Sequence, residues 1–188
     1  MKIGGKVPER VVVPAIRSFG AMRPRLMLDD ENVRVYIVEA DASSIIGPAP
    51  FVARNECVIG LAGTRVITYT DGKRELVIRH PVGDICFTRD LPAWATERVG
   101  VTLAEPVAWV CLTLKKFQPE HAVLVRGEKF SWHATDGDTL AVAIEGSLRI
   151  DGETVEAPVS IMLPAGKRAL PTIASADAVV IVLYGSAK

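Results

Sequence analysis

The hydrophobic positions of this chain fall in short runs, and turn-forming residues separate the runs at regular intervals. The runs are rich in Val, Ile and Thr, and Gly, Pro and Asp-Gly pairs stand between them. This pattern is typical of β-strands. One short helical turn is expected at residues 92–97. We expect strands at residues 33–38, 57–61, 65–70, 75–79, 85–88, 107–114, 122–125, 130–134, 140–144, 147–150, 159–163 and 178–184.

Two Asp-Gly pairs each stand between two of these runs. They are Asp71-Gly72 and Asp151-Gly152. An Asp-Gly pair accepts the positive φ angles of a tight turn, so both pairs predict β-hairpins. Many short strands joined by regular turns favour an all-β sandwich or barrel.

The two halves of the chain repeat one arrangement. Each half has an apolar strand that reaches a Gly, a hairpin through Asp-Gly, a Leu-Pro-Ala element and a Val-rich closing strand. An internal repeat of this kind indicates two copies of one unit. We place the boundary at the polar segment LKKFQPE, which divides the chain into an N-terminal extension (1–32), a first barrel (33–115) and a second barrel (116–188). The VVVPAI piece of the extension is expected to pair with a sheet edge.

Composition and charge exclude several classes of protein. The chain has 188 residues, of which 49% are hydrophobic, enough for a sizeable core. Basic and acidic residues balance at 22 each, so no basic footprint for nucleic acid is present. The N-terminal sequence lacks the apolar region of a signal peptide, and no apolar run reaches about 18 residues. We therefore expect a cytoplasmic protein that does not span a membrane.

Three cysteines, Cys57, Cys86 and Cys111, lie inside largely apolar runs, and no CxxC pair exists. These positions indicate small, reduced core residues, which suits a reducing compartment. Other residues are also expected to be structural or peripheral. Trp94, Trp109 and Trp132 are expected in the core, His80 on the surface in a turn, and His121 at the start of a strand near the domain junction.

The second half carries a set of spaced residues known from a metal-binding motif. That motif runs Gly, five residues, His, one residue, His, three residues, Glu, six residues, Gly. Here Gly127, His133 and Gly146 are in register, while Thr135 and Thr139 stand where the second His and the Glu would be. The spacing places alternate strand residues on one face, so a His-x-His pair would aim both imidazoles into a barrel.

A second motif, Pro-x-Gly followed two residues later by His, matches Pro164 and Gly166, but Ala169 stands at the His position. Together these residues resemble the two motifs of the cupin superfamily. The resemblance implies two tandem cupin-type (jelly-roll) barrels, as in RmlC-like bicupins. Lys167 and Arg168 follow Gly166 at a barrel corner, where they either bind an anionic ligand or are solvated.

Three of the four cupin ligand positions in the second barrel are substituted. A lone His133 does not hold a divalent ion firmly when Thr and Ala replace its partners. We therefore expect no metal and no cofactor. His133 is then either a hydrogen-bonded barrel residue or a group that contacts the ligand or transfers protons.

The first half keeps less of the motif. Glu56 and Gly63 keep the spacing of its last two positions, but Ala49 and Phe51 stand where the two histidines would be. In the frame of the second motif, Glu97 occupies the His position.

Glu56 and Glu97 could therefore both face the barrel. Two inward carboxylates could share a proton or act as acid and base. Alternatively, they lie at the barrel mouth and pair with Arg54 or Arg98.

The first half also resembles one cupin family, the WxcM-like nucleotide-sugar ketoisomerases. The resemblance covers residues 11–115 and rests on the stretches VPAIRSFGAMRPRLM, VRVYIVEA, CVIGLAGTRVITYTDGKRE and LPAWATE. It implies proton transfers by paired histidines during keto-sugar isomerisation. Here APFV stands at the matching positions and Ala95 follows Trp94, so the family's acid–base groups are substituted.

Three hypotheses about function remain. The first is a metal-free bicupin, expected to form a homodimer, that binds a small organic ligand such as a sugar or sugar acid. The second is an isomerase or epimerase acting on a nucleotide sugar, with His133 and Glu56 as acid–base groups. The third is an oligomerisation scaffold whose barrels are filled by side chains. The expected ligand-binding residues are Thr135, Thr139, Glu97, Arg54, Lys167 and Arg168.

Overall fold

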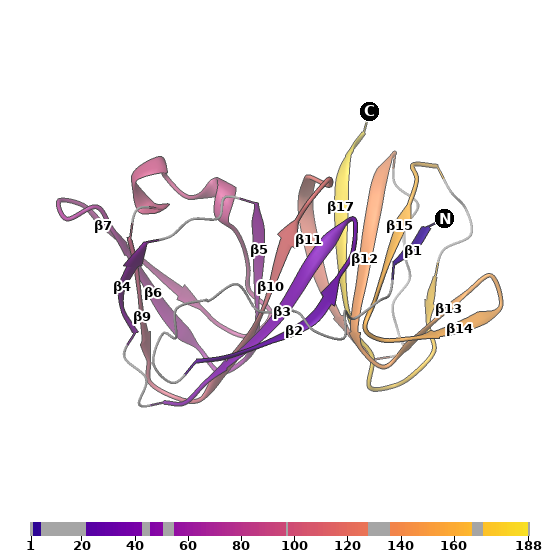
Figure 1. The fold of residues 1–188 in the computed structure, drawn as a ribbon, viewed down its shortest axis with the longest axis horizontal. Helices are drawn as coiled ribbons and strands as arrows, with labels where there is room; N and C mark the ends of the chain where they lie inside the picture. Colours follow the sequence, from indigo (N-terminus) through magenta and orange to yellow (C-terminus); the bar gives the residue numbers. More distant parts are fainter. Residues whose placement is uncertain are drawn as a thin grey trace. The chain divides into compact units, whose positions relative to one another are not determined.

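The fold was obtained as a computed structural model, which describes residues 2–4, 22–42, 46–50, 55–96, 98–127, 136–166 and 171–187. The described residues form strands and two short 3-10 helices, η1 (Thr88–Asp90) and η2 (Ala93–Thr96) (Figure 1). No helix among them is long and apolar enough to cross a membrane. The strands are β1 (Lys2–Gly4), β2 (Arg23–Asp29), β3 (Val33–Ala40), β4 (Ile46–Pro50), β5 (Glu56–Ala62), β6 (Arg65–Thr70), β7 (Glu75–His80), β8 (Ile85–Phe87), β9 (Arg98–Leu103), β10 (Val107–Leu114), β11 (Pro119–Arg126), β12 (Gly137–Glu145), β13 (Ser147–Ile150), β14 (Glu153–Glu156), β15 (Val159–Leu163), β16 (Thr172–Ile173) and β17 (Val179–Ala187).

The chain forms two compact units that are not continuous in sequence. The N-terminal unit is made of Pro8–Leu26 and Val35–Thr113, and the C-terminal unit of Met1–Val7, Met27–Arg34 and Leu114–Lys188. The boundaries that we predicted after residues 32 and 115 stay predictions. The structure adds that the β2–β3 turn groups with the C-terminal unit.

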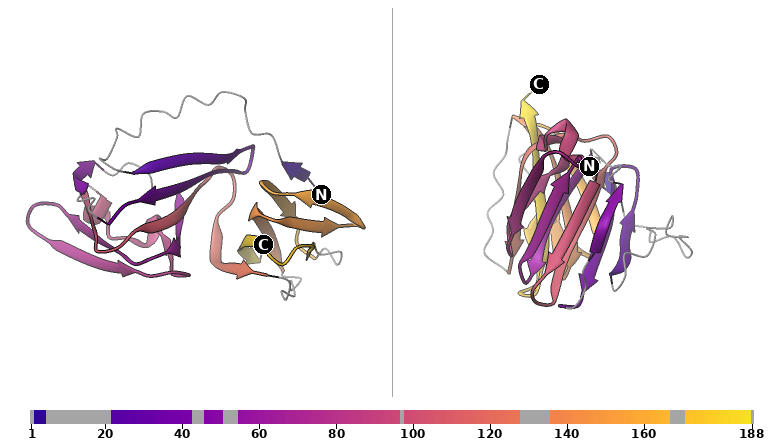
Figure 2. Two further views of the ribbon diagram at one scale, coloured as in Figure 1. Left: turned by 90° about the horizontal axis from the view of Figure 1, so that it is seen from below. Right: turned by 90° about the vertical axis from the view of Figure 1, so that its left-hand side faces the viewer.

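Each unit is a pair of antiparallel sheets. In the N-terminal unit the sheets have the strand orders β2-β3-β10-β5-β8 and β4-β9-β6-β7. In the C-terminal unit the orders are β1-β15-β12-β17-β11 and β14-β13-β16. Figure 2 shows the layers of the N-terminal unit, with β2 and β3 on one side and the β6–β7 hairpin on the other. The all-β prediction is confirmed.

Both Asp-Gly hairpins are present, and each has a local cause. Asp151 and Gly152 adopt φ angles of 51° and 89° between β13 and β14, as a two-residue hairpin turn requires. Between β6 and β7, Asp71 Oδ1 accepts hydrogen bonds from the backbone N–H groups of Lys73 and Arg74 at 2.9 and 2.8 Å. These turns set the register of the strands that follow them.

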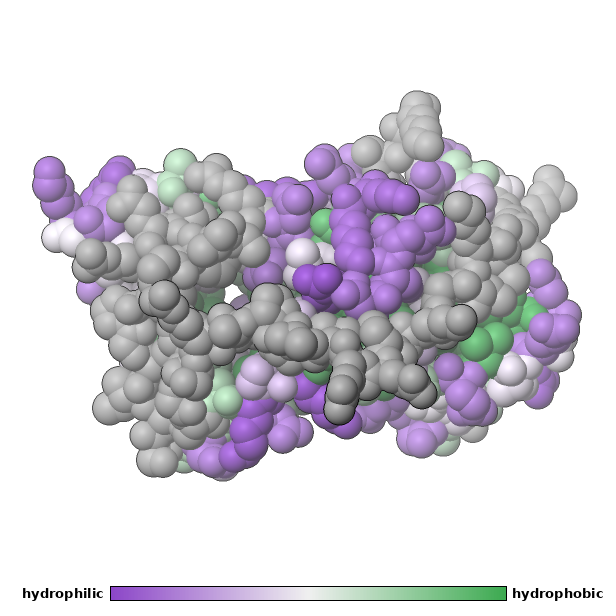
Figure 3. Space-filling view, in the orientation of Figure 1, coloured by the Kyte–Doolittle hydropathy of each residue, from purple (hydrophilic) through white to green (hydrophobic). Residues whose placement is uncertain are grey.

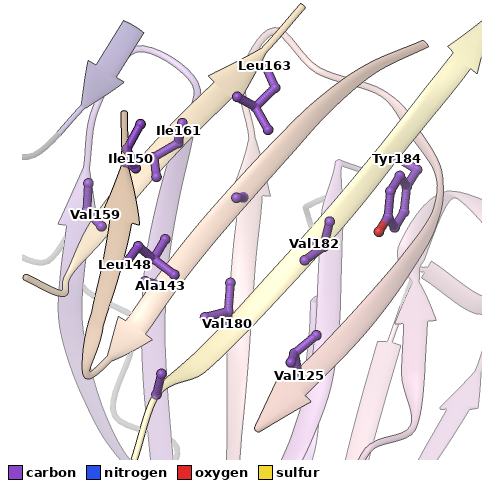
Figure 4. Packing of buried hydrophobic residues seen from close by; sticks show 12 residues of the cluster. Val125, Ala143, Leu148, Ile150, Val159, Ile161, Leu163, Val180, Val182 and Tyr184 are labelled. Atoms are coloured by element: carbon purple, nitrogen blue, oxygen red, sulfur yellow. The ribbon is translucent and has the colours of Figure 1, made fainter. Parts of the chain in front are cut away.

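Apolar side chains from both sheets of the C-terminal unit pack together in its interior. Figure 4 shows how they point toward one another from β11, β12, β13, β15 and β17. Small residues on β12 leave room for larger ones on the facing strands, and this dense packing stabilises the unit. The buried cluster consists of Val125, Ala141, Ala143, Leu148, Ile150, Val159, Ile161, Leu163, Ala178, Val180, Val182 and Tyr184.

A polar network binds the β2–β3 turn to the rest of the C-terminal unit. Asp30 Oδ1 accepts hydrogen bonds from the backbone N–H groups of Asn32 and Val33 at 2.8 and 2.9 Å. The hydroxyl of the fully buried Ser160 donates to Asp30 Oδ2. Lys115 Nζ lies 2.5 Å from Asp29 Oδ1. Figure 3 shows hydrophilic residues gathered over this turn.

The interior of the N-terminal unit is less uniformly apolar. Along β6 every second residue is buried, and Ile67 and Tyr69 belong to the core. Trp109 lies in the same core, as the sequence predicted, and Trp94 packs against it. The remaining buried members of this core are Tyr36, Val38, Ala40, Val58, Ala95, Val101, Leu103 and Val107.

Candidate functional site

Most of the catalytic and ligand-binding residues that we predicted from the sequence lie outside the described part of the chain. Glu56 and Thr139 are described, and their positions can be compared with the prediction. Among the described residues, no group of three or more His, Cys, Asp or Glu side chains could hold a metal ion. The nominated residues that lie outside the described part are His133, Thr135, Glu97, Arg54, Lys167 and Arg168.

Thr139 faces the interior of the C-terminal barrel. It pairs with Leu163 on one side and Tyr184 on the other, and both belong to the buried core. Thr139 shares its strand face with Ala141 and Ala143 and is only 6% exposed. The position aligned with the cupin Glu is therefore inward, but the described side chains around it are mostly apolar.

Glu56 faces the interior of the N-terminal barrel. It is the first residue of β5, lies opposite Thr113 on β10, and shares a strand face with the core residue Val58. The hydroxyl of Thr88 accepts the Glu56 backbone N–H at 3.1 Å and lies 3.2 Å from the Glu56 carbonyl oxygen, so the backbone is held at this point.

The Glu56 carboxyl is half-buried and weakly bonded. Its Oε1 accepts a hydrogen bond from the Thr113 hydroxyl at 3.5 Å, near the upper limit for such a bond. Burial raises the pKa of Glu56, and the Thr113 hydrogen bond acts in the opposite direction. Toward the described residues, the carboxyl therefore keeps unused hydrogen-bonding capacity at a position that faces the barrel interior.

Two cysteines lie on the same inner face. Cys86 and Cys111 each pair with Val58, from the two strands that flank β5. Strands two apart in a sheet are separated by about 9.5 Å, too far for a disulfide, and all three cysteines are free. Cys57 is buried, whereas Cys86 and Cys111 are partly exposed. Burial raises the pKa of Cys111 to about 12, which keeps the thiol protonated.

Arg65 is a buried cation in the same barrel. It begins β6 on the face that Ile67 and Tyr69 share, and it is 6% exposed. Its Nε donates a hydrogen bond to His80 Nδ1 at 3.3 Å, and its Cζ lies 4.6 Å from the centre of the Trp109 ring. Cation, ring and imidazole therefore form one cluster inside the N-terminal unit.

The prediction that His80 is a surface turn residue is wrong. His80 is the last residue of β7, pairs with Arg65, and is 1% exposed. It continues the inward alternation of Leu76 and Ile78, and the turn begins only at Pro81. Burial and the Arg65 charge lower the pKa of His80 to about 4, so the ring is neutral at pH 7.

The sequence reasoning missed Arg65, His80 and Tyr69 as inward polar groups. None of them occupies a cupin motif position. The available signal was alternation, because Arg65 lies two residues before Ile67 and His80 lies two residues after Ile78. The other face of β6 carries Val66 and Thr68, so the pattern alone did not identify the inner face. Burial raises the pKa of Tyr69 to about 12.

Comparison with solved structures defines the class of fold. HutD from Pseudomonas fluorescens superposes with a TM-score of 0.51 at 15% identity, covering 98% of this chain and 99% of that one. Hazelnut (Corylus avellana) vicilin gives 0.57 at 14% identity over 90% and 83%. Oxalate decarboxylase from Bacillus subtilis gives 0.51 at 10% identity over 90% and 78%.

These three structures have the cupin fold, and at such low identities the similarity concerns the fold alone. The chain is an all-β protein with two tandem cupin-type barrels. No protein-family model matches its sequence, and no curated protein matches it.

Proposed function

We propose that this chain is a metal-free bicupin that binds a small organic ligand inside its N-terminal barrel. The observation that carries the proposal is the inward carboxyl of Glu56, whose hydrogen bond to Thr113 is long at 3.5 Å. A partly buried carboxyl with acceptor capacity that the described residues leave unused is suited to the hydroxyl groups of a sugar or sugar acid. The described interior of the C-terminal barrel is apolar, so the ligand is placed in the N-terminal barrel.

The remaining features of the proposal come from the sequence. We expect a homodimer in the cytoplasm that requires no cofactor. In the C-terminal barrel, Thr135 and Thr139 replace two metal ligands of the cupin motif, which supports a metal-free protein. Arg54 and Glu97 are proposed to contact the ligand at the N-terminal barrel, and Lys167 with Arg168 to contact an anionic group at the C-terminal barrel.

A thermal-shift panel tests this proposal, because a ligand that binds only the folded state raises the melting temperature. The panel contains neutral sugars, sugar acids, nucleotide sugars, and divalent metals with and without chelator. We expect a selective shift with one sugar class that Glu56→Gln abolishes. The exposed Glu75 on β7 provides the matched control, and Glu75→Gln should keep the shift. A metal shift reversed by chelator would contradict a metal-free protein, and a shift unchanged in Glu56→Gln would contradict the assigned site.

A second candidate function is isomerisation or epimerisation of a nucleotide sugar. The raised pKa of Glu56 favours it, because a carboxyl that titrates closer to neutrality is a better acid–base catalyst. His133 would supply a second acid–base group. If this candidate is right, Glu56→Gln and His133→Ala each abolish turnover of the nucleotide sugar that gives the thermal shift, and both variants stay folded. Turnover that survives both substitutions excludes the assigned residues.

A further inference from the structure

The Arg65 guanidinium carries a permanent positive charge, and the described residues around it supply little negative charge to balance it. Arginine stays protonated in proteins, so burial does not neutralise it. The side chain is 6% exposed, and burial lowers its pKa, although the surrounding groups Cys111, Tyr69, Cys86 and Asp84 act in the opposite direction. Among the described residues, none contributes a carboxylate oxygen within 4.0 Å of it.

The two contacts that Arg65 makes leave one edge of the guanidinium available. Its Nε donates a hydrogen bond to His80 Nδ1, and one face of the planar guanidinium lies over the Trp109 ring. The two terminal nitrogens make no hydrogen bond to the residues that the structure describes. Together they form the fork that binds a carboxylate through two parallel hydrogen bonds. Because His80 Nδ1 accepts the Nε proton, a neutral His80 carries its own proton on Nε2.

The Nε2–H group of His80 also lacks an acceptor among the described residues. His80 Nε2 is fully buried and makes no hydrogen bond to any described residue, and Asp84 Oδ2 lies 3.9 Å away. The Val58 backbone is the other polar neighbour of this ring, and hydrogen bonding to it acts to raise the His80 pKa. The cluster therefore contains one fully buried donor without a described acceptor, His80 Nε2, next to a buried positive charge, and each is costly without a partner.

We propose that Arg65 binds an anionic group of a small molecule held inside the N-terminal barrel, with His80 orienting the guanidinium. This inference rests on the proposed function and narrows its ligand to an acid. A carboxylate fits the terminal fork, and a phosphate oxygen pair presents the same chemistry. A cation–π contact and one hydrogen bond offset only part of the cost of removing the charge from water, so an anion completes the site.

The test compares an acid with its neutral counterpart. Calorimetric titrations with D-glucuronate, D-glucose and inorganic phosphate are run on wild type, Arg65→Lys and Arg65→Met. The control is Arg79→Met, which removes an exposed arginine on the neighbouring strand β7. We expect glucuronate to bind more tightly than glucose. Arg65→Lys should weaken glucuronate binding by about 10- to 100-fold, Arg65→Met should abolish the preference for the acid, and the control should change neither.

The ligand-free proteins provide a second measurement. Arg65→Met removes a buried charge that lacks an anion, so its melting temperature should equal or exceed that of wild type. A lower melting temperature, with the preference for the acid intact, would show that Arg65 is only structural. If Arg65→Met does not fold, Arg65→Lys still gives the binding comparison.

The outcomes also separate this inference from the proposed function. Equal binding of glucose and glucuronate in wild type and Arg65→Lys would overturn the inference and leave the proposed sugar site standing. Absence of binding by both sugars and by phosphate would overturn both. Tighter binding of phosphate than of glucuronate, lost in Arg65→Met, would support the anion site and assign it to a phosphate.

Discussion

Protonation of His80 should destabilise this protein below pH 6.5. The side chain is 1% exposed, and burial together with the Arg65 charge lowers its pKa from 6.5 to about 4, against the opposing effect of Asp84. The unfolded chain takes up a proton on this residue near pH 6.5, whereas the folded protein does so only near pH 4. The free energy of unfolding therefore falls as the pH decreases from 6.5 to 4, and above 6.5 this contribution is constant.

The size of the effect follows from the pKa difference. A fall from 6.5 to about 4 corresponds to a loss of about 3 kcal/mol. Small domains have unfolding free energies of about 5–15 kcal/mol, so the loss is a large fraction of the total.

Urea unfolding between pH 8 and pH 4 measures this effect, on wild type and on His80→Asn. The Asn side chain keeps an acceptor near the position of Nδ1 for the Arg65 N–H, but it does not titrate. Carboxyl groups titrate in both proteins, so the difference between their curves isolates His80. We expect wild type to lose about 3 kcal/mol more than His80→Asn over this interval.

His121 provides the control. Its side chain is exposed near the start of β11 and stacks on Tyr184, with 4.6 Å between the ring centroids. The variant His121→Asn should keep the wild-type pH dependence, because His80 is intact. Parallel loss of stability in wild type and His80→Asn between pH 7 and pH 4 would refute the reasoning.

Two further predictions concern the C-terminal unit, and both are measured by urea unfolding. A Cβ on Gly146, whose φ is 74°, would lie 2.6 Å from Ala178 Cα, whereas Gly152, with φ 89°, has open space around it. Gly152→Ala should therefore lower the free energy of unfolding by about 1–2 kcal/mol, because of its positive φ alone. Gly146→Ala should lower it by about 1–3 kcal/mol more, because of the clash. Equal losses in the two variants would contradict the clash. Ser160→Ala removes the buried donor to Asp30 and should cost about 1–3 kcal/mol, so an unchanged unfolding free energy would show that this bond does not hold the β2–β3 turn.

Much of the secondary structure was accessible from the sequence because its causes are local. β6, β10, β13 and β15 begin and end at the predicted residues, and the helical turn expected at residues 92–97 is η2. Strand composition, turn chemistry and Asp-Gly pairs act over a few residues, so a single sequence displays them. The inward position of Glu56 also followed from a local motif, since residues two apart share a strand face.

The cluster around Arg65 could not be predicted in the same way. Arg65 and Trp109 belong to different sheets of the N-terminal unit, and only the packing of these sheets brings the guanidinium over the indole ring. His80 was misplaced because a His-Pro pair suggested a turn, while the pairing of β7 with β6 placed its ring inside.

What the sequence by itself determined was the all-β class, most strand positions and the hairpin turns. It also showed that Thr135, Thr139 and Ala169 stand where the cupin motifs carry metal ligands. Only the tertiary structure decided which strand face became the barrel interior. Alternation with a period of two residues defines two faces of a strand, but it does not show which face points into the barrel. In β5 both faces carry buried apolar residues, as Cys57, Val58 and Ile59 show. Which face encloses the polar groups depends on contacts between strands that are distant in sequence, and those contacts exist only in the folded chain.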